Sequence, residues 1–218
     1  MKALIIGTGP SLSEVAHLIP RFDGLIFGPN NTFLDFPLDV WHATDPTWNN
    51  HFGQVHGDFD KWHWSRAICT QYGYKYVEGV WMVDGVAYPR NQHERPPGPC
   101  GDMWMADKTR VSLNHCSTAV LLNLAVNQYE CDEVVLIGHD FHYDGPQRHY
   151  FDGLSDVAGE YPAELRKHSQ FIKNNGTDDL LAVYKRISET PGLPPIYNAT
   201  PGSKLPWFEF RDFGDFLK

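Results

Sequence analysis

Short apolar runs alternate with longer amphipathic segments along most of the chain. Six of the runs are typical of buried strands, and they cover residues 2–6, 24–27, 39–43, 67–70, 134–137 and 196–199. Four longer segments carry apolar side chains at helical spacing, namely residues 13–19, 117–127, 163–173 and 178–188. Strands that alternate with helices in this way predict an α/β fold with a mostly parallel sheet and helices on both faces.

Almost every predicted strand ends in a polar turn that contains glycine or proline. The turns read GTGPS, GPNN, ATDP, GHDFHYDG and NATPGS. In open α/β sheets, ligands bind beyond the carboxyl ends of the strands. Five polar turns at that edge therefore predict a large site with many hydrogen-bonding groups, which suits a nucleotide together with a second substrate.

The first turn joins a predicted strand to a predicted helix. Gly7 and Gly9 allow the backbone to turn sharply and to approach a ligand closely, and Ser11 or Ser13 can cap the helix that follows. This arrangement directs backbone N–H groups at an anion. However, Leu12 replaces the last glycine of a Gly-x-Gly-x-x-Gly motif, and no Gly-Lys-Ser/Thr follows. A tight β–α turn without a ligand fits the sequence equally well.

Residues 73–113 are irregular, and glycine, proline and turn dipeptides recur in them. A small hairpin is predicted at residues 80–86, around Asp84-Gly85. Insertions of this length in a compact domain are usually functional loops or lids. We therefore expect one domain, residues 1–218, in which residues 73–113 are a lid or an acceptor-binding insertion.

The chain carries a net charge of −9 and no basic run, whereas proteins that hold DNA by its phosphates usually show a basic face. Folding can still assemble a basic patch from Lys61, Arg66, Arg90, Arg95, Lys108 and Arg110. Aromatic residues make up 14% of the chain, which is typical either of core packing or of a site that stacks sugars or bases.

Three features of the sequence predict a cytoplasmic protein. The apolar run at the start stops at Gly7, so no signal peptide is expected, and no stretch is long enough to span a membrane. The cysteines show no paired spacing and are typical of reduced cytosolic thiols: Cys69, Cys100, Cys116 and Cys131.

The stretch GHDFHYDGPQRHYFDG concentrates histidine and aspartate residues after the strand at 134–137. Such side chains suit manganese or zinc, but the spacing contains no cysteine and no His-x-x-x-His pair. A hydrogen-bonded site or a solvated turn is therefore favoured over a metal site. Asp140 is the strongest functional candidate, because a carboxylate at the end of a buried strand must find partners; its structural alternative is to cap the next turn.

Four pieces of the chain resemble a known superfamily: LIIGTGPSL, STAVLLNLAVNQYECDEVVLIGHDFHYDG, HYFDG and IYNATPGSKLPWF. They are similar to the Rossmann-like superfamily that contains bacterial lipooligosaccharide sialyltransferases, flagellin-modifying motility accessory factor proteins and 6-hydroxymethylpterin diphosphokinase-like proteins. Phages and prophages carry many relatives. The resemblance implies a Rossmann-like domain and a glycosyltransferase that uses a nucleotide sugar, often without a metal.

The resemblance also assigns roles to residues. Thr8 stands where the sialyltransferases have an asparagine that touches the nucleotide. Their general base is a histidine after Gly-x-Asp-Phe, for which His149 and His168 are the candidates, with Asp140 as a third catalytic candidate; a HWFGDH-like signature of the phage relatives favours His149. The implied nucleotide-binding set is Gly7, Thr8, Gly9, Pro10, Ser11, Asn30, Asn31, Asp45, Ser117, Thr118, Gly138 and His142.

Taken with the polar strand-end turns, the resemblance implies a glycosyltransferase that moves a sugar from a nucleotide sugar to a hydroxyl acceptor, in the host cytoplasm if a phage encodes it. The acceptor is a hydroxymethylated base in phage DNA, a cell-surface glycan or a small molecule. No cofactor is expected to be required, a divalent metal is the less favoured alternative, and a homo-oligomer is left open. The competing functions are nucleotide binding without catalysis and a pterin-type diphosphokinase that uses ATP and Mg²⁺ through Asp45, Asp140 and Asp144.

Overall fold

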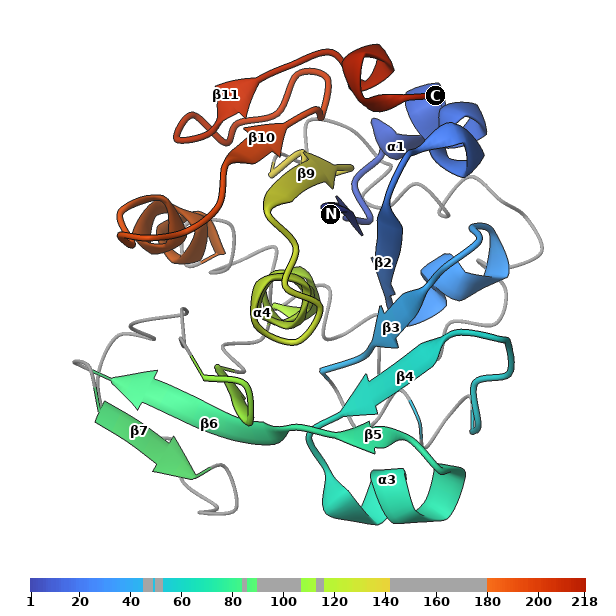
Figure 1. The fold of residues 1–218 in the computed structure, drawn as a ribbon, viewed down its shortest axis with the longest axis vertical. Helices are drawn as coiled ribbons and strands as arrows, with labels where there is room; N and C mark the ends of the chain where they lie inside the picture. Colours follow the sequence, from blue (N-terminus) through green and yellow to red (C-terminus); the bar gives the residue numbers. More distant parts are fainter. Residues whose placement is uncertain (45–48, 50–52, 84–85, 90–106, 113–115, 142–179) are drawn as a thin grey trace.

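The main element of the fold is a parallel sheet of eight strands, in the order β11-β10-β9-β1-β2-β3-β4-β5 (Figure 1). This computed structural model describes residues 1–44, 49, 53–83, 86–89, 107–112, 116–141 and 180–218. The strands are β1 (Lys2–Ile6), β2 (Leu25–Pro29), β3 (Val40–His42), β4 (Asp60–His63), β5 (Lys75–Tyr76), β9 (Glu133–Ile137), β10 (Ile196–Asn198) and β11 (Glu209–Phe210). The predicted α/β fold is confirmed.

The direction of strand addition reverses at the centre of the sheet. From β1 the chain adds β2 to β5 on one side, and then returns to place β9 on the other side of β1. Ile5 of β1 lies between Phe27 of β2 and Leu136 of β9. The gap between the carboxyl ends of β1 and β9 is therefore a topological switch point, the position where open α/β sheets bind ligands.

Apolar side chains of alternating strand positions supply two cores, one on each face of the sheet. In β1, Ala3 and Ile5 face one core, while Leu4 and Ile6 face the other. The first core is covered by α4 (Ser117–Asn127) and by the helical residues 180–188. The second is covered by α1 (Leu12–Val15), the 3-10 helices η1 (Ala16–Arg21) and η4 (Phe213–Phe216), and α3 (Arg66–Tyr72).

Several predicted elements differ from the observed ones. The strand predicted at residues 67–70 is wrong, because those residues lie in α3, which Gly73 ends in a left-handed conformation with φ +73°. An apolar run of four residues cannot separate a strand from a buried helix by periodicity. The strand β4 was missed, since its sequence DKWH is largely polar. The helix predicted at 13–19 is a single turn, α1, followed by η1, which contains Pro20.

The predicted hairpin is confirmed. β6 (Glu78–Val83) pairs antiparallel with β7 (Val86–Pro89), and β8 (Arg110–Ser112) pairs parallel with β6 to complete a small second sheet. β8 lies against α4. Residues 75–76 of the predicted insertion belong to the main sheet as β5. The role of this region as a lid stays a prediction, and the helix predicted at 163–173 lies outside the described residues.

Candidate functional site

The turn after β1 is docked onto the end of β9. The Gly7 amide donates to the Ile137 carbonyl over 2.6 Å, and the Gly9 amide donates to the Gly138 carbonyl over 2.8 Å. A Cβ at position 7 would lie 2.2 Å from the Gly138 oxygen. Glycine at position 7 is therefore required by the close approach of two backbones.

Asp140, which follows β9, makes a further contact with the turn after β1. Its carboxylate accepts the Ser11 amide at 3.0 Å and the Ser11 hydroxyl at 2.8 Å, and the residue is 3% exposed. A Cβ at Gly9 would lie 1.8 Å from Asp140 Oδ2. Asp140 thus fixes the turn that was predicted to bind a nucleotide, and its catalytic role stays a prediction.

These hydrogen bonds limit what the turn can offer to an anion. The amides of Gly7, Gly9 and Ser11 all donate to groups at the end of β9, and Pro10 has no amide hydrogen. These three amides are therefore engaged within the protein. The nucleotide role of the turn stays a prediction, while its role in joining β1 to β9 is a property of the fold.

His139 is a buried titratable group at the end of β9. Its Nδ1 lies 3.0 Å from the Ile137 carbonyl, which can only accept, so Nδ1 carries the proton and Nε2 accepts from the Tyr184 hydroxyl at 3.0 Å. Burial lowers the pKa of His139 from 6.5 to about 4. The imidazole is therefore neutral at pH 7 and is already hydrogen-bonded at both nitrogens.

We expect this buried histidine to make the fold sensitive to acid. An unfolded chain binds a proton at His139 below pH 6.5, and the native chain does so only near pH 4, so stability falls as the pH is lowered through this window. Between pH 7.5 and pH 5 the loss attributable to this group is about 2 kcal/mol. The measurement is the free energy of unfolding in urea at several pH values, for the wild type and for His139→Gln.

The informative quantity in that comparison is the slope against pH, because His139→Gln lowers the absolute stability as well. The variant should show a shallower fall between pH 6.5 and pH 4 than the wild type. Equal slopes for the two proteins would contradict the assignment of a neutral buried histidine.

The amino end of α4 lies between the ends of β3 and β9. Ser117 Oγ accepts the Thr44 amide at 3.1 Å and donates to Thr44 Oγ1 at 3.0 Å, directly after β3. Thr118 Oγ1 lies 2.7 Å from the hydroxyl of Tyr184, which contacts His139 of the β9 end. Ser117 was predicted as the N-cap of this helix, but the N-cap is Cys116, so Ser117 is the first helical residue.

Cys116 is held as a neutral thiol. Burial raises the pKa of this thiol, although the Thr118 hydroxyl and the amides of Thr118 and Ala119 act in the opposite direction. Its Sγ lies 3.2 Å from Thr118 Oγ1. A thiol in this state is a poor nucleophile, so Cys116 is a packing residue of the helix end.

Two residues at the carboxyl edge adopt a backbone conformation that side chains other than glycine rarely take. Asn30, the first residue of η2 (Asn30–Leu34), has φ +49°, and its carbonyl accepts the Trp41 indole N–H at 2.7 Å. Phe141, which follows Asp140, has φ +54°. Strained residues of this kind gather at functional sites. Asn31, also predicted to bind the nucleotide, is 1% exposed.

The turn after β10 completes the enclosure of His139 and Asp140. Thr200 Oγ1 accepts the His139 amide at 3.0 Å, and Ser203 Oγ donates to the His139 carbonyl at 2.6 Å. The Lys204 amide donates to the Asp140 carbonyl at 3.0 Å. Three of the five predicted strand-end turns, those after β1, β9 and β10, are therefore joined through these two residues.

Some predicted site residues lie outside the part of the chain that the structure describes: Asp45, His142, Asp144, His149 and His168. In the remainder, no group of three histidine, cysteine or acidic residues is placed to hold a metal ion. The described ranges likewise hold no helix that is both long enough and apolar enough to cross a membrane.

Sequence reasoning missed His42, Thr44 and Tyr184. Thr44 stands in the turn ATDP that was assigned to the edge, so its position was available from the sequence. The positions of His42 and Tyr184 could not be recognised in this way, because each lies within a predicted apolar strand or helix and not in a strand-end turn. Both are 0% exposed.

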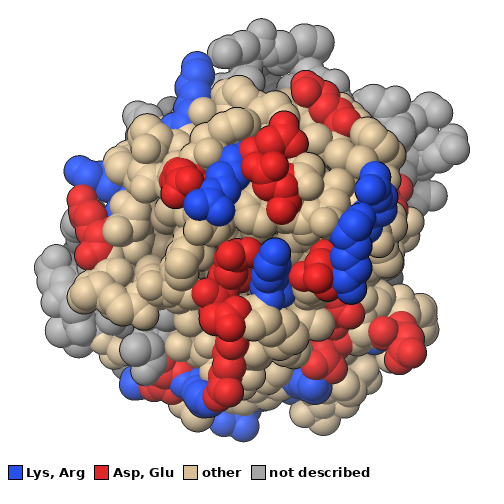
Figure 2. Space-filling model, turned by 45° about the horizontal axis from the view of Figure 1, so that its top comes forward, with Lys and Arg blue, Asp and Glu red and all other residues tan. Residues whose placement is uncertain are grey.

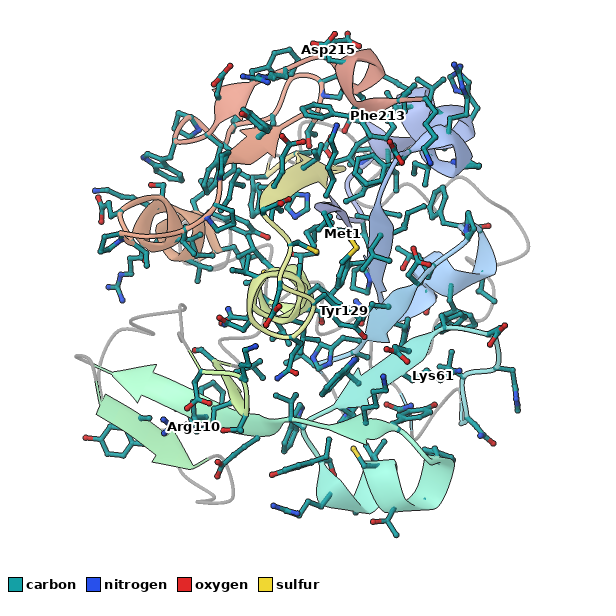
Figure 3. The ribbon with its side chains drawn as sticks, in the orientation of Figure 1. Met1, Lys61, Arg110, Tyr129, Phe213 and Asp215 are labelled. Atoms are coloured by element: carbon teal, nitrogen blue, oxygen red, sulfur yellow. The ribbon has the colours of Figure 1, made fainter. Side chains whose placement is uncertain are left out.

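The predicted basic patch is not a continuous surface in the described residues. Lysines and arginines alternate with acidic side chains on the face shown in Figure 2, and Lys61 and Arg110 lie well apart in Figure 3. Arg90 and Arg95 are outside the described residues. The other four cations have partners: Lys108 with Glu130, Arg110 with Asp107, Lys61 with the carbonyls of Gly57 and Phe59, and Arg66 with the ring of Tyr76.

The fold and the switch point define an α/β protein with a Rossmann-like parallel sheet. No family model, no curated protein and no solved structure matches the chain.

Proposed function

We propose that the protein is a glycosyltransferase that binds a nucleotide sugar at the switch point between β1 and β9. One observation carries the proposal: the turn after β1, the end of β9 and the first turn of α4 meet at this point. α4 is a helix of 11 residues, so its amino end supplies a partial positive charge. A diphosphate beside this end suits both the geometry and the resemblance of the motifs.

The chemistry of glycosyl transfer requires two functions from the protein. Donors must stabilise the negative charge of the departing nucleotide, and a base must accept the proton of the acceptor hydroxyl. In the proposed site the first function falls to main-chain amides, because the hydroxyls of Ser117 and Thr118 are engaged with Thr44 and Tyr184.

The general base is proposed to be His149, with His168 as the alternative, as the resemblance of the motifs implies. His139 is unsuited to the role, since its Nε2 accepts from Tyr184 and the residue is 3% exposed. The acceptor is proposed to be a hydroxyl of a glycan, a small molecule or a hydroxymethylated DNA base. The partnered cations of the described surface favour the first two.

A diphosphokinase is the competing proposal, and Asp140 argues against it. Both oxygens of this carboxylate accept hydrogen bonds from Ser11. A buried carboxylate that holds a turn through both of its oxygens is poorly placed to bind Mg²⁺ as well.

The proposal predicts binding of UDP- or CMP-sugars without Mg²⁺, with affinities of roughly micromolar to millimolar. The measurement is calorimetric titration with UDP-sugars, CMP-sugars and ATP, each with and without Mg²⁺. Hydrogen exchange with and without the ligand locates the site. Protection is expected at residues 117–120 and 138–141, and α3 provides an internal reference because it packs in the core on the other face of the sheet from α4.

Each alternative result has a defined meaning. Binding of ATP that requires Mg²⁺ would replace the proposal with the diphosphokinase. Nucleotide binding without transfer to any acceptor hydroxyl would leave a binding protein. Protection confined to the β6–β7 hairpin would move the site away from the switch point.

A further inference from the structure

The end of β9 is connected to α4 by a chain of buried hydrogen bonds. It begins at the Ile137 carbonyl, passes through His139 and the Tyr184 hydroxyl, and reaches Thr118 Oγ1 at distances of 3.0, 3.0 and 2.7 Å. The direction of every bond is fixed. Since the single hydroxyl proton of Tyr184 goes to His139 Nε2, Thr118 must donate to Tyr184.

A second chain of the same design connects the end of β3 to α4. The Trp62 carbonyl lies 3.0 Å from His42 Nδ1, and His42 Nε2 lies 3.2 Å from Thr44 Oγ1. Ser117 Oγ then donates to Thr44 Oγ1 at 3.0 Å. The Trp62 carbonyl fixes the proton on Nδ1, so Nε2 accepts from Thr44 just as in the first chain.

The two chains end on consecutive residues of α4 and begin on strands at either side of the central pair β1–β2. Both histidines are buried, with 0% exposure for His42 and 3% for His139. We propose that His42 and His139 are positioning residues that fix the first turn of α4 at the switch point, each through one chain of hydroxyl groups. The effect on ligand binding rests on the proposed function, whereas the effect on α4 does not.

This arrangement has a chemical consequence for the site. Both hydroxyl protons at the start of α4 are directed to the protein, at Thr44 and Tyr184, so neither is available to a ligand unless its chain breaks. The two chains therefore determine where the main-chain amides of the first turn of α4 lie. Breaking one chain should loosen that end of the helix and leave the other end unchanged.

Two variants break one chain each with little change of shape. Tyr184→Phe removes the hydroxyl in the middle of the His139 chain, and Thr44→Val removes the hydroxyl in the middle of the His42 chain. Tyr74→Phe is the matched control. Its hydroxyl is also hydrogen-bonded, to the Val55 amide at 2.6 Å, but Tyr74 follows α3 and packs in the core on the other face of the sheet from α4.

The first readout needs no ligand. Hydrogen exchange at the amides of residues 118–121 should become about tenfold faster in Tyr184→Phe and in Thr44→Val, because one buried hydrogen bond is lost in each. Tyr74→Phe should leave these amides unchanged, and Thr44→Ser, which keeps the hydroxyl, should restore the protection lost in Thr44→Val. Unchanged exchange in both chain variants, or equal acceleration in the control, would overturn the positioning role.

The second readout is the affinity for uridine, cytidine and adenosine diphosphates by calorimetric titration. Tyr184→Phe and Thr44→Val should each weaken binding about tenfold, while Tyr74→Phe should remain within a factor of about two even if its melting temperature falls. An equal loss in all three variants would show a general effect of stability and refute the proposal. If the wild type binds none of these probes, the proposed function fails, and hydrogen exchange alone decides the role of the two histidines.

Discussion

Replacing Gly9 by alanine is expected to destabilise the protein by about 3–5 kcal/mol, which is a large part of the stability of a domain of this size. The added Cβ would lie 1.8 Å from Asp140 Oδ2 and 2.8 Å from the Gly138 carbonyl oxygen. One of these groups must move, and the hydrogen bonds between Asp140 and Ser11 are lost with the movement. Unfolding in urea, followed by circular dichroism, measures the effect.

Gly192→Ala is the matched control for this substitution. Gly192 has φ +80°, and a Cβ there would meet nothing within 4 Å, so alanine suffers only the strain of the left-handed conformation. Its cost should be about 1–2 kcal/mol. If Gly9→Ala proved no more destabilising than Gly192→Ala, the close docking of the β1 turn on β9 would be refuted.

Asp140→Ala is expected to destabilise the protein by about 3 kcal/mol. The substitution leaves the Ser11 amide and hydroxyl without their acceptor, and a buried donor without a partner costs about 1–3 kcal/mol. A second change, Ser11→Ala, removes the hydroxyl, which is one of the two donors that lose their acceptor. The double variant should therefore be more stable than the sum of the two single losses predicts.

The control for Asp140 is Asp212, which accepts the Gly214 amide at the start of η4. Asp212 is exposed, so Asp212→Ala should cost about 1 kcal/mol, the usual value for a helix cap. Strict additivity of Ser11→Ala and Asp140→Ala would show that the two side chains do not act together, in disagreement with their distances.

The sheet was predictable from the sequence where strands are buried on both faces. β1 and β9 are continuous apolar runs because each of their faces packs on a core, and such runs are recognisable without any other information. The turns after them were recognisable as well, because glycine and polar residues interrupt the runs. The assembly of Gly9, Ser11 and Asp140 followed from the rule that parallel strands share one carboxyl edge.

Other features required the three-dimensional arrangement. β4 lies toward the edge of the sheet, and only His63 of its four residues is buried, so it lacks the apolar signature. The partners of His139 could not be predicted either, since Tyr184 approaches from a helix 45 residues further along the chain. Hydrogen bonds between side chains on distant elements leave no periodicity in the sequence.

The central place of β1 has a consequence for the order in which the protein folds. The first residues of the chain pair with β9, and the amino group of Met1 reaches Asp132, 131 residues away. During synthesis one edge of β1 therefore stays without its neighbour until β9 has left the ribosome. An open apolar edge of this kind is prone to pair with other chains. Folding dominated by such distant contacts is slow, so nascent or truncated chains that stop before β9 should aggregate where the full chain folds.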